Sequence, residues 1–395
     1  MLNKSPLFFI LVLLILNPYT VIGPFGYYVA APIFFYSLRY LTIINLKILF
    51  LFIFCIFISI LGVLSSVVHG IDQLEHFKVS VLIFVYFIIG FGLCLGLSNK
   101  IRFIDFLVLS MYVVVLNGVV VLLQVIFPEF RSIVESAFVE GGNIDWTEGF
   151  RFRGLASAGG ASLSVLSAVM VYLSLHLYSN NRINIIKLYF ILLILITSVL
   201  FIGRTGVLLI SVALLMYVVS NGFLNLRILI YFIAGVLLFI FIGVDLIEDF
   251  ISYYFGDGYF KYSLGFILEG KDGIEGEGTT QVVYEYLKVL PSGFPEVVTG
   301  YGFYGGSSFT PWTDSGYARM FLSVGYLFGF LFYVSIFYIF WFSSVSKKDL
   351  LFPILILLAI SEVKEPLLLS GFSARLFFIL LGFSAAEKIK SKTVV

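Results

Sequence analysis

The chain has 395 residues, of which 61% are hydrophobic and 12% are charged, and its mean hydropathy is +1.09. A soluble domain carries about 25% charged residues, so this composition excludes that class. The net charge is +1 and no block of lysines and arginines is present, which argues against nucleic-acid binding. We therefore predict an all-α polytopic membrane protein that forms a single integral membrane domain over residues 1–395.

The apolar runs predict about twelve transmembrane helices, because each run is close to the length that spans a bilayer. They cover residues 7–23, 25–41, 47–68, 79–97, 103–127, 158–178, 186–202, 206–220, 228–244, 316–342, 350–361 and 367–386. The second, eighth and eleventh runs are short or are interrupted by Gly and Pro. Each of these three is also consistent with a tilted or re-entrant segment.

The orientation follows from the lysines and arginines, which concentrate in alternate short loops that include Lys4, Lys100 and Lys388. By the positive-inside rule these loops and both termini face the cytoplasm. The opposite side then holds two long loops, residues 128–157 and residues 245–315. Within the second loop, the stretch "TTQVVYEYLKVL" (residues 279–290) is typical of an amphipathic helix on the membrane surface.

Four polar motifs fall on this outer side, and each directly precedes a helix that runs inward. They are "EGFRFRGLASAGGASLS" (148–164), "GRTG" (203–206), "TPWTDSGYARMF" (310–321) and "SEVKEP" (361–366). The N-terminus of an inward-running helix presents free N–H groups and its positive dipole end to the outer face. The glycines at 159, 160 and 206 are expected to let the backbone approach a ligand closely.

Basic side chains gather in the same outer half of the predicted bundle. They are Arg151, Arg153, Arg204, Arg319, Lys364 and Arg375. Arginines beside helix N-termini suit phosphate or pyrophosphate groups, because both supply charged or oriented N–H donors. At membrane depth, the expected source of such a group is a lipid-linked phosphate.

Each motif also has a purely structural interpretation. Arg151 and Arg153 would then pair with acidic residues of a solvated loop, and Arg204 would extend to the outer interface. Asp314 would be the N-cap of the helix that follows it, since "TDSG" is a favourable capping sequence. "SEVKEP" would be a salt-bridged turn, and Arg375 would pair within the bundle.

Other chemistries have little support in the sequence. The three histidines are far apart and give no metal-ligand spacing, and no phosphate-binding glycine loop of the soluble nucleotide enzymes is present. No pair of nearby carboxylates stands out for a divalent ion. We therefore expect no cofactor and no metal site.

The sequence also resembles a known family. The many spans, the "RFRG" segment before a span, the "GRTG" turn, the large late outer loop and "TDSGYARMFLSVGYLFGFLFY" (313–333) are similar to those of bacterial O-antigen polymerases of the Wzy type. The resemblance implies an all-helical, GT-C-like glycosyltransferase of the inner membrane, with its two long loops and its active site facing the periplasm. The related O-antigen ligases carry a histidine in the late outer loop, whereas this chain has none after His176.

The resemblance implies that a growing polysaccharide on undecaprenyl pyrophosphate is transferred to a new lipid-linked repeat unit. Its partners would be these repeat units, the bilayer and a chain-length regulator. Asp314 and Glu362 are the predicted catalytic carboxylates, which accept or orient the proton of the attacking hydroxyl group. The basic residues named above would stabilise the leaving pyrophosphate without a metal ion. An O-antigen ligase and a flippase or other transporter of lipid-linked oligosaccharides remain the alternatives.

Overall fold

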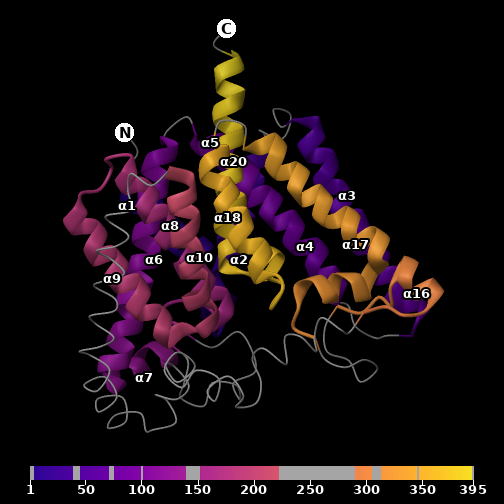
Figure 1. Ribbon diagram of the computed structural model, residues 1–395, viewed down its shortest axis with the longest axis horizontal. Helices are drawn as coiled ribbons and strands as arrows, with labels where there is room; N and C mark the ends of the chain where they lie inside the picture. The colour runs from indigo at the N-terminus through magenta and orange to yellow at the C-terminus, as the bar shows by residue number, and fades with distance from the viewer. Residues whose placement is uncertain are drawn as a thin grey trace. The chain divides into compact units, whose positions relative to one another are not determined.

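The computed structural model describes residues 4–38, 45–70, 75–98, 101–138, 152–221, 290–304, 313–344 and 347–393 (Figure 1). The chain divides into two compact units. Unit 1 comprises Met1–Pro18, Pro24–Val113 and Gln281–Val395, and unit 2 comprises Tyr19–Gly23 and Val114–Thr280. The expectation of a single integral membrane domain over residues 1–395 stays a prediction, and the two units are described separately below.

The described part of the chain is helical, apart from a short ladder between α1 and α2. Its first elements are α1 (Lys4–Leu16), β1 (Tyr19–Thr20), β2 (Gly23–Pro24), α2 (Phe25–Leu38), α3 (Leu46–Val68), α4 (Glu75–Phe87), the π-helix η2 (Ile88–Leu93), α5 (Cys94–Leu97) and α6 (Phe103–Ile126). The middle of the chain forms α7 (Pro128–Ala137), α8 (Ala161–Ser179), α9 (Ile185–Ile202) and α10 (Arg204–Asn221). The last elements are α16 (Phe294–Thr299), α17 (Gly316–Ser343), α18 (Lys348–Ser361), α19 (Leu367–Ser370) and α20 (Phe372–Thr393).

Within the described ranges, five helices are long and apolar enough to cross a membrane, namely α3, α6, α8, α9 and α17. Shorter apolar helices cover Ser5–Leu16, Phe77–Leu93 and Arg204–Ser220. The prediction of a helical protein with several membrane spans is thus confirmed, and the count of twelve stays a prediction. The expected span at residues 228–244 and the amphipathic stretch at 279–290 lie outside the described residues, apart from Leu290 at the end of that stretch. The two expected long loops contain the helices α7 and α16, which no apolar run predicts.

Unit 2 is built around α8, which is buried on almost every side by α9 and α10. Its small residues allow this close approach. An ideal Cβ added to Gly206 of α10 would lie only 2.5 Å from Ser164 Cβ and 2.7 Å from the Ser164 carbonyl oxygen. Small residues at helix contacts are typical of membrane bundles, where close packing replaces the hydrophobic effect as the driving force.

In unit 1, α17 packs beside α3, and α20 packs against η2. The most important departure from the predicted span at residues 316–342 is a break in α17 at Gly325, where φ is 76° and ψ is 172°. Figure 1 shows the break as a change of direction in the orange ribbon. We call residues 316–324 the short arm and residues 326–343 the long arm of α17.

The break in α17 is supported by the segment that contains α16. The N–H groups of Tyr301 and Gly302 donate to the carbonyls of Leu322 and Ser323, at 2.6 and 3.0 Å. These carbonyls precede the break and would otherwise lose their partners in the helix. Non-helical backbone at membrane depth requires such protein partners, since lipid supplies none.

Candidate functional site

The site residues expected from the sequence belong to both units. Arg153 and Arg204 lie in unit 2, whereas Asp314, Arg319, Glu362, Lys364 and Arg375 lie in unit 1, and Arg151 lies outside the described residues. The structure brings several of them together within each unit. The convergence of all the basic residues on one pyrophosphate stays a prediction.

In unit 2, the "RFRG" segment lies alongside the "GRTG" turn. The Phe152 N–H donates to the Phe201 carbonyl at 3.1 Å, and the Gly160 N–H donates to the Ile202 carbonyl at 3.2 Å. Arg204 is the first residue of α10 and follows this contact directly. The two segments that carry Arg153 and Arg204 are therefore neighbours in the fold.

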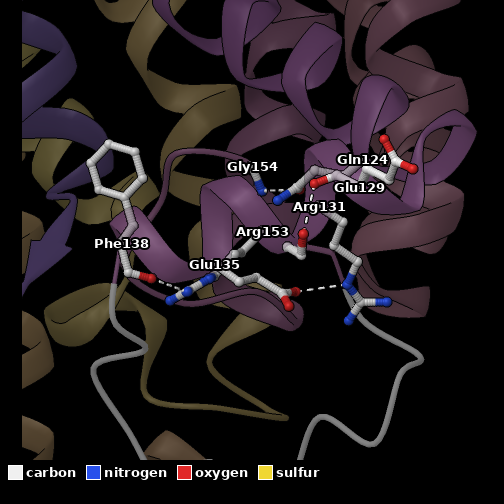
Figure 2. Close-up of polar contacts among 8 residues, drawn as sticks. Gln124, Glu129, Arg131, Glu135, Phe138, Arg153 and Gly154 are labelled. Carbon is white, nitrogen blue, oxygen red and sulfur yellow. Dashed lines mark hydrogen bonds and ion pairs between the residues drawn. The ribbon is translucent and has the colours of Figure 1, made fainter.

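Arg153 is buried, with 6% of its surface exposed, so the alternative of a solvated surface pair does not describe it. Its Nη2 donates to the carbonyl of Phe138, the C-cap residue of α7 (Figure 2). A guanidinium at a helix C-terminus satisfies a free carbonyl and opposes the negative end of the helix dipole. Arg153 thus ties the end of α7 to the "RFRG" segment.

Two buried amides of α6 hold the same segment and were missed by the sequence analysis. Gln124 Oε1 accepts the Gly154 N–H at 3.0 Å (Figure 2), and Asn117 Oδ1 accepts the Leu155 N–H at 2.7 Å. Both side chains are at most 2% exposed. The available signal was their position, since polar amides inside an apolar span must find partners.

The glycines of unit 2 allow close packing of the main chain, and their predicted approach to a ligand stays a prediction. Gly206 faces the backbone of Ser164, and a Cβ added to Gly203 would lie 3.0 Å from the carbonyl carbon and oxygen of Gly160, which is closer than ordinary van der Waals contact. The N–H of Gly160 is already bonded to Ile202. Gly206 and Gly160 thus lie at the contacts between α8, α10 and the end of α9.

In unit 1, Asp314 and Arg319 form an ion pair at the start of the short arm. Arg319 Nη2 lies 2.9 Å from Asp314 Oδ1, and Arg319 Nε donates to the Thr313 carbonyl at 2.8 Å. The N-cap of α17 is Ser315, whose hydroxyl accepts the Ala318 N–H, so the capping role considered for Asp314 belongs to its neighbour. The Asp314 side chain is 38% exposed and therefore accessible.

Glu362 lies in the turn after α18 and is buried, with 1% of its surface exposed. Tyr333 Oη donates to Glu362 Oε1 at 3.0 Å, and the Leu368 N–H donates to Glu362 Oε2 at 2.7 Å. The Glu362 carbonyl accepts the Gly316 N–H at 2.9 Å, which joins this turn to the first residue of the short arm. An ideal Cβ on Gly316 would collide with the Glu362 carboxylate, so only glycine permits this contact.

Burial raises the pKa of the Glu362 carboxyl group from 4.5 to about 7, because the ionised form loses its hydration. The hydrogen bonds from the Leu368 N–H and the Tyr333 hydroxyl, together with the charge of Arg319, oppose this increase. Glu362 therefore changes its charge near neutral pH. This property suits a group that takes part in, or responds to, proton transfer.

The remaining cations lie near the same turn in sequence. Lys364 is part of the turn, and its N–H donates to the Ser361 carbonyl at 3.0 Å. Arg375 is in the first turn of α20, with its guanidinium carbon 5.5 Å from the centroid of the Phe372 ring and with Tyr86 of α4 beside it. In the described part of the chain, Arg375 Nη1 is buried without a hydrogen-bond partner.

No protein-family model, no curated protein and no solved structure matches the chain. Among the described residues, no three His, Cys, Asp or Glu side chains gather in a possible metal site. The absence of a metal and of a cofactor from the chemistry stays a prediction.

Proposed function

We propose that the protein is an integral-membrane glycosyltransferase of the O-antigen polymerase type. It transfers a growing polysaccharide from undecaprenyl pyrophosphate to a new lipid-linked repeat unit. The observation that carries this proposal is the Asp314–Arg319 pair at the start of the short arm, with Glu362 buried at the same helix start. An accessible carboxylate beside a cation and a helix N-terminus suits a reaction that removes a proton and releases an anion.

The two predicted catalytic carboxylates differ in accessibility, and we base their proposed roles on this difference. A general base must lie within hydrogen-bonding reach of the proton that it accepts. Asp314 is 38% exposed and meets this requirement, whereas Glu362 is 1% exposed. We assign proton acceptance to Asp314 and assign to Glu362 the support of the helix start that carries it.

In the proposed reaction, a hydroxyl oxygen of the acceptor sugar forms a bond to the anomeric carbon of the donor. The bond between that carbon and the pyrophosphate oxygen breaks, and its electron pair leaves with undecaprenyl pyrophosphate. The hydroxyl proton passes to Asp314. Positive groups placed where this charge develops lower the barrier. We assign this role to Arg319, Lys364 and Arg375 of unit 1 together with Arg151, Arg153 and Arg204.

The finer architecture belongs to the same proposal. It comprises twelve transmembrane helices in a GT-C-like arrangement, both termini in the cytoplasm and the reaction at the periplasmic face of a bacterial inner membrane. The partners are the lipid-linked repeat units, the bilayer and a chain-length regulator. The positive-inside distribution of lysines and arginines supports this orientation.

A strain that lacks the protein tests the proposal and separates it from its alternatives. Loss of a polymerase leaves single repeat units on the lipid A core. Loss of a ligase leaves polymer on the carrier lipid, and loss of a flippase leaves neither product outside. Complementation with Asp314→Asn should give single repeats at a normal protein level. Asp349→Asn, the same change in the first turn of α18, should restore the polymer. Full polymer from Asp314→Asn would reject the assigned base.

A further inference from the structure

We propose that Tyr333 is a positioning residue for the reaction proposed above. Its hydroxyl fixes Glu362, and Glu362 in turn holds the start of the short arm that carries Asp314 and Arg319. This inference rests on the proposed function for its catalytic consequence, although the contact itself can be tested without any activity. No pattern in the sequence singles out Tyr333.

The fold-back of α17 is what brings Tyr333 to this place. Tyr333 lies on the long arm, but its ring packs against two aromatic rings of the short arm. The centroid of the Tyr333 ring lies 4.8 Å from that of Tyr317 and 6.4 Å from that of Phe321. An unbroken helix would place these residues several turns away from Tyr333. The break at Gly325 therefore places the Tyr333 hydroxyl beside the turn that contains Glu362.

Both carboxylate oxygens of Glu362 have a fixed donor. Tyr333 Oη binds Oε1 at 3.0 Å, and the backbone N–H of Leu368, at the second residue of α19, binds Oε2 at 2.7 Å. A buried carboxylate that is held at both oxygens has one orientation. Without Tyr333, Oε1 would lose this donor in a site that is closed to water, which is unfavourable for the ionised form.

Glu362 passes this constraint to the short arm through the main chain. Its carbonyl binds the Gly316 N–H at 2.9 Å, and Tyr317 Oη donates to the Ala359 carbonyl at 2.9 Å. Asp314 and Arg319 flank this anchored helix start. Catalytic groups depend on such supporting contacts, because a displacement of about 1 Å can lower turnover by about 100-fold.

The charged and titratable groups that act on Glu362 are few in the described structure. They are Tyr333 and Tyr317 of α17 and the Arg319 guanidinium. Of these, Tyr333 alone donates a hydrogen bond to the carboxylate from its side chain. The substitution Tyr333→Phe removes this donor and leaves the aromatic packing with Tyr317 and Phe321 in place.

The first experiment measures the infrared carbonyl band of protonated Glu362 in the purified full-length protein as a function of pH. Glu362→Gln identifies the band. Tyr333→Phe should raise the titration midpoint by about 1 pH unit, because the lost hydrogen bond favours the carboxylate. 3-Fluorotyrosine at position 333, a stronger donor, should lower the midpoint. The control Tyr338→Phe alters an exposed tyrosine of the same helix and should change nothing.

The second experiment measures polymer in the deletion strain complemented with the same variants. Tyr333→Phe should lower long-chain polymer about tenfold, and the double variant with Glu362→Gln should be no worse than Glu362→Gln alone, since Tyr333 acts through Glu362. The inference would be overturned if the losses of polymer caused by Tyr333→Phe and Glu362→Gln multiplied in the double variant. It would also be overturned if both Tyr333 variants left the infrared midpoint of Glu362 unchanged. If the deletion strain makes normal polymer, the proposed function fails. The infrared midpoints alone then test the hydrogen bond between Tyr333 and Glu362.

Discussion

The rings of Tyr317 and Tyr333 lie with their centroids 4.8 Å apart, although both residues belong to α17. In a straight helix, their backbones would be about 24 Å apart. The difference is due to the break at Gly325, and the segment from α16 to Tyr304 packs on that break. The start of the short arm, where Asp314 and Arg319 lie, is therefore folded back toward the middle of its own helix.

The break depends on glycine at position 325. A φ of 76° is unfavourable for any residue with a side chain, and an added Cβ would meet the Val297 carbonyl at 2.7 Å and collide with that of Val298. We expect Gly325→Ala to lower the free energy of unfolding by about 2 kcal/mol and to abolish polymer. Thermal unfolding in detergent and analysis of the glycan chain length measure the two effects.

Gly329→Ala provides a matched control in the same helix. The backbone of Gly329 is helical, and the added methyl group would lie 2.6 Å from Cδ1 of the Phe321 ring rather than against a carbonyl, so a side chain and not the main chain has to shift. We expect a clearly smaller loss of stability than for Gly325→Ala. Equal effects at the two glycines would contradict the importance of the break.

The stability of the protein should depend on pH through Glu362. The pKa of Glu362 is about 7 in the folded protein, whereas the unfolded chain has the ordinary value of 4.5. Between pH 4.5 and about 7 the folded protein therefore retains a proton that the unfolded chain releases. The free energy of unfolding should therefore fall as pH rises from 4.5 to about 7, by about 3 kcal/mol in total. Denaturant titrations at several pH values measure this slope. Glu362→Gln should remove it, and a slope that persists in this variant would assign the effect to other groups.

The buried amides of α6 should contribute to stability and to the position of Arg153. Gln124→Leu keeps the approximate volume of the side chain but leaves the buried Gly154 N–H without its acceptor. We expect the free energy of unfolding to fall by about 1–3 kcal/mol and the polymer to shorten. Thr197→Leu is a suitable control, since its hydroxyl bonds only to the carbonyl of its own helix at an exposed position. A Gln124→Leu protein of normal stability would show that water replaces the amide.

Arg204 should be needed for activity and dispensable for insertion. Arg204→Ala removes the cation at the start of α10, where we propose that it stabilises the leaving pyrophosphate. Long polysaccharide should disappear while the amount of protein in the membrane stays normal, as measured by immunoblot of membrane fractions. Arg182→Ala, at the opposite end of α9, should keep the polymer. Wild-type chain lengths from Arg204→Ala would reject the pyrophosphate role.

The positions of the helices could be predicted from the sequence because each apolar run must satisfy its backbone within itself. The break in α17 could not be predicted this way, since glycines are common in continuous membrane helices. Gly325 differs from Gly329 in its tertiary contacts, since Val297 and Val298 pack against it and Tyr301 and Gly302 bond to the carbonyls before it. The helices α7 and α16 could not be predicted because they are short and lie within long polar loops.

The site shows a similar division. Asp314 and Arg319 were each predicted as site residues, whereas their ion pair was not, because the five-residue spacing differs from the three or four residues of helical ion pairs. The burial of Glu362 and its contact with Tyr333 depend on the fold-back, so no local pattern distinguished Glu362 from an ordinary turn carboxylate. Likewise, Ser315 rather than Asp314 is the N-cap, because neighbouring capping residues differ only in where the first helical turn begins.

The broken helix also changes how the bilayer fits this part of the chain. As one straight rod, the 28 residues of α17 would be about 42 Å long, which exceeds a hydrocarbon thickness of about 30 Å. The long arm alone would be about 27 Å long and matches that thickness without tilting. Topology reporters inserted before Gly316 and after Val324 should therefore report the same side of the membrane, and one inserted after Ser344 should report the other.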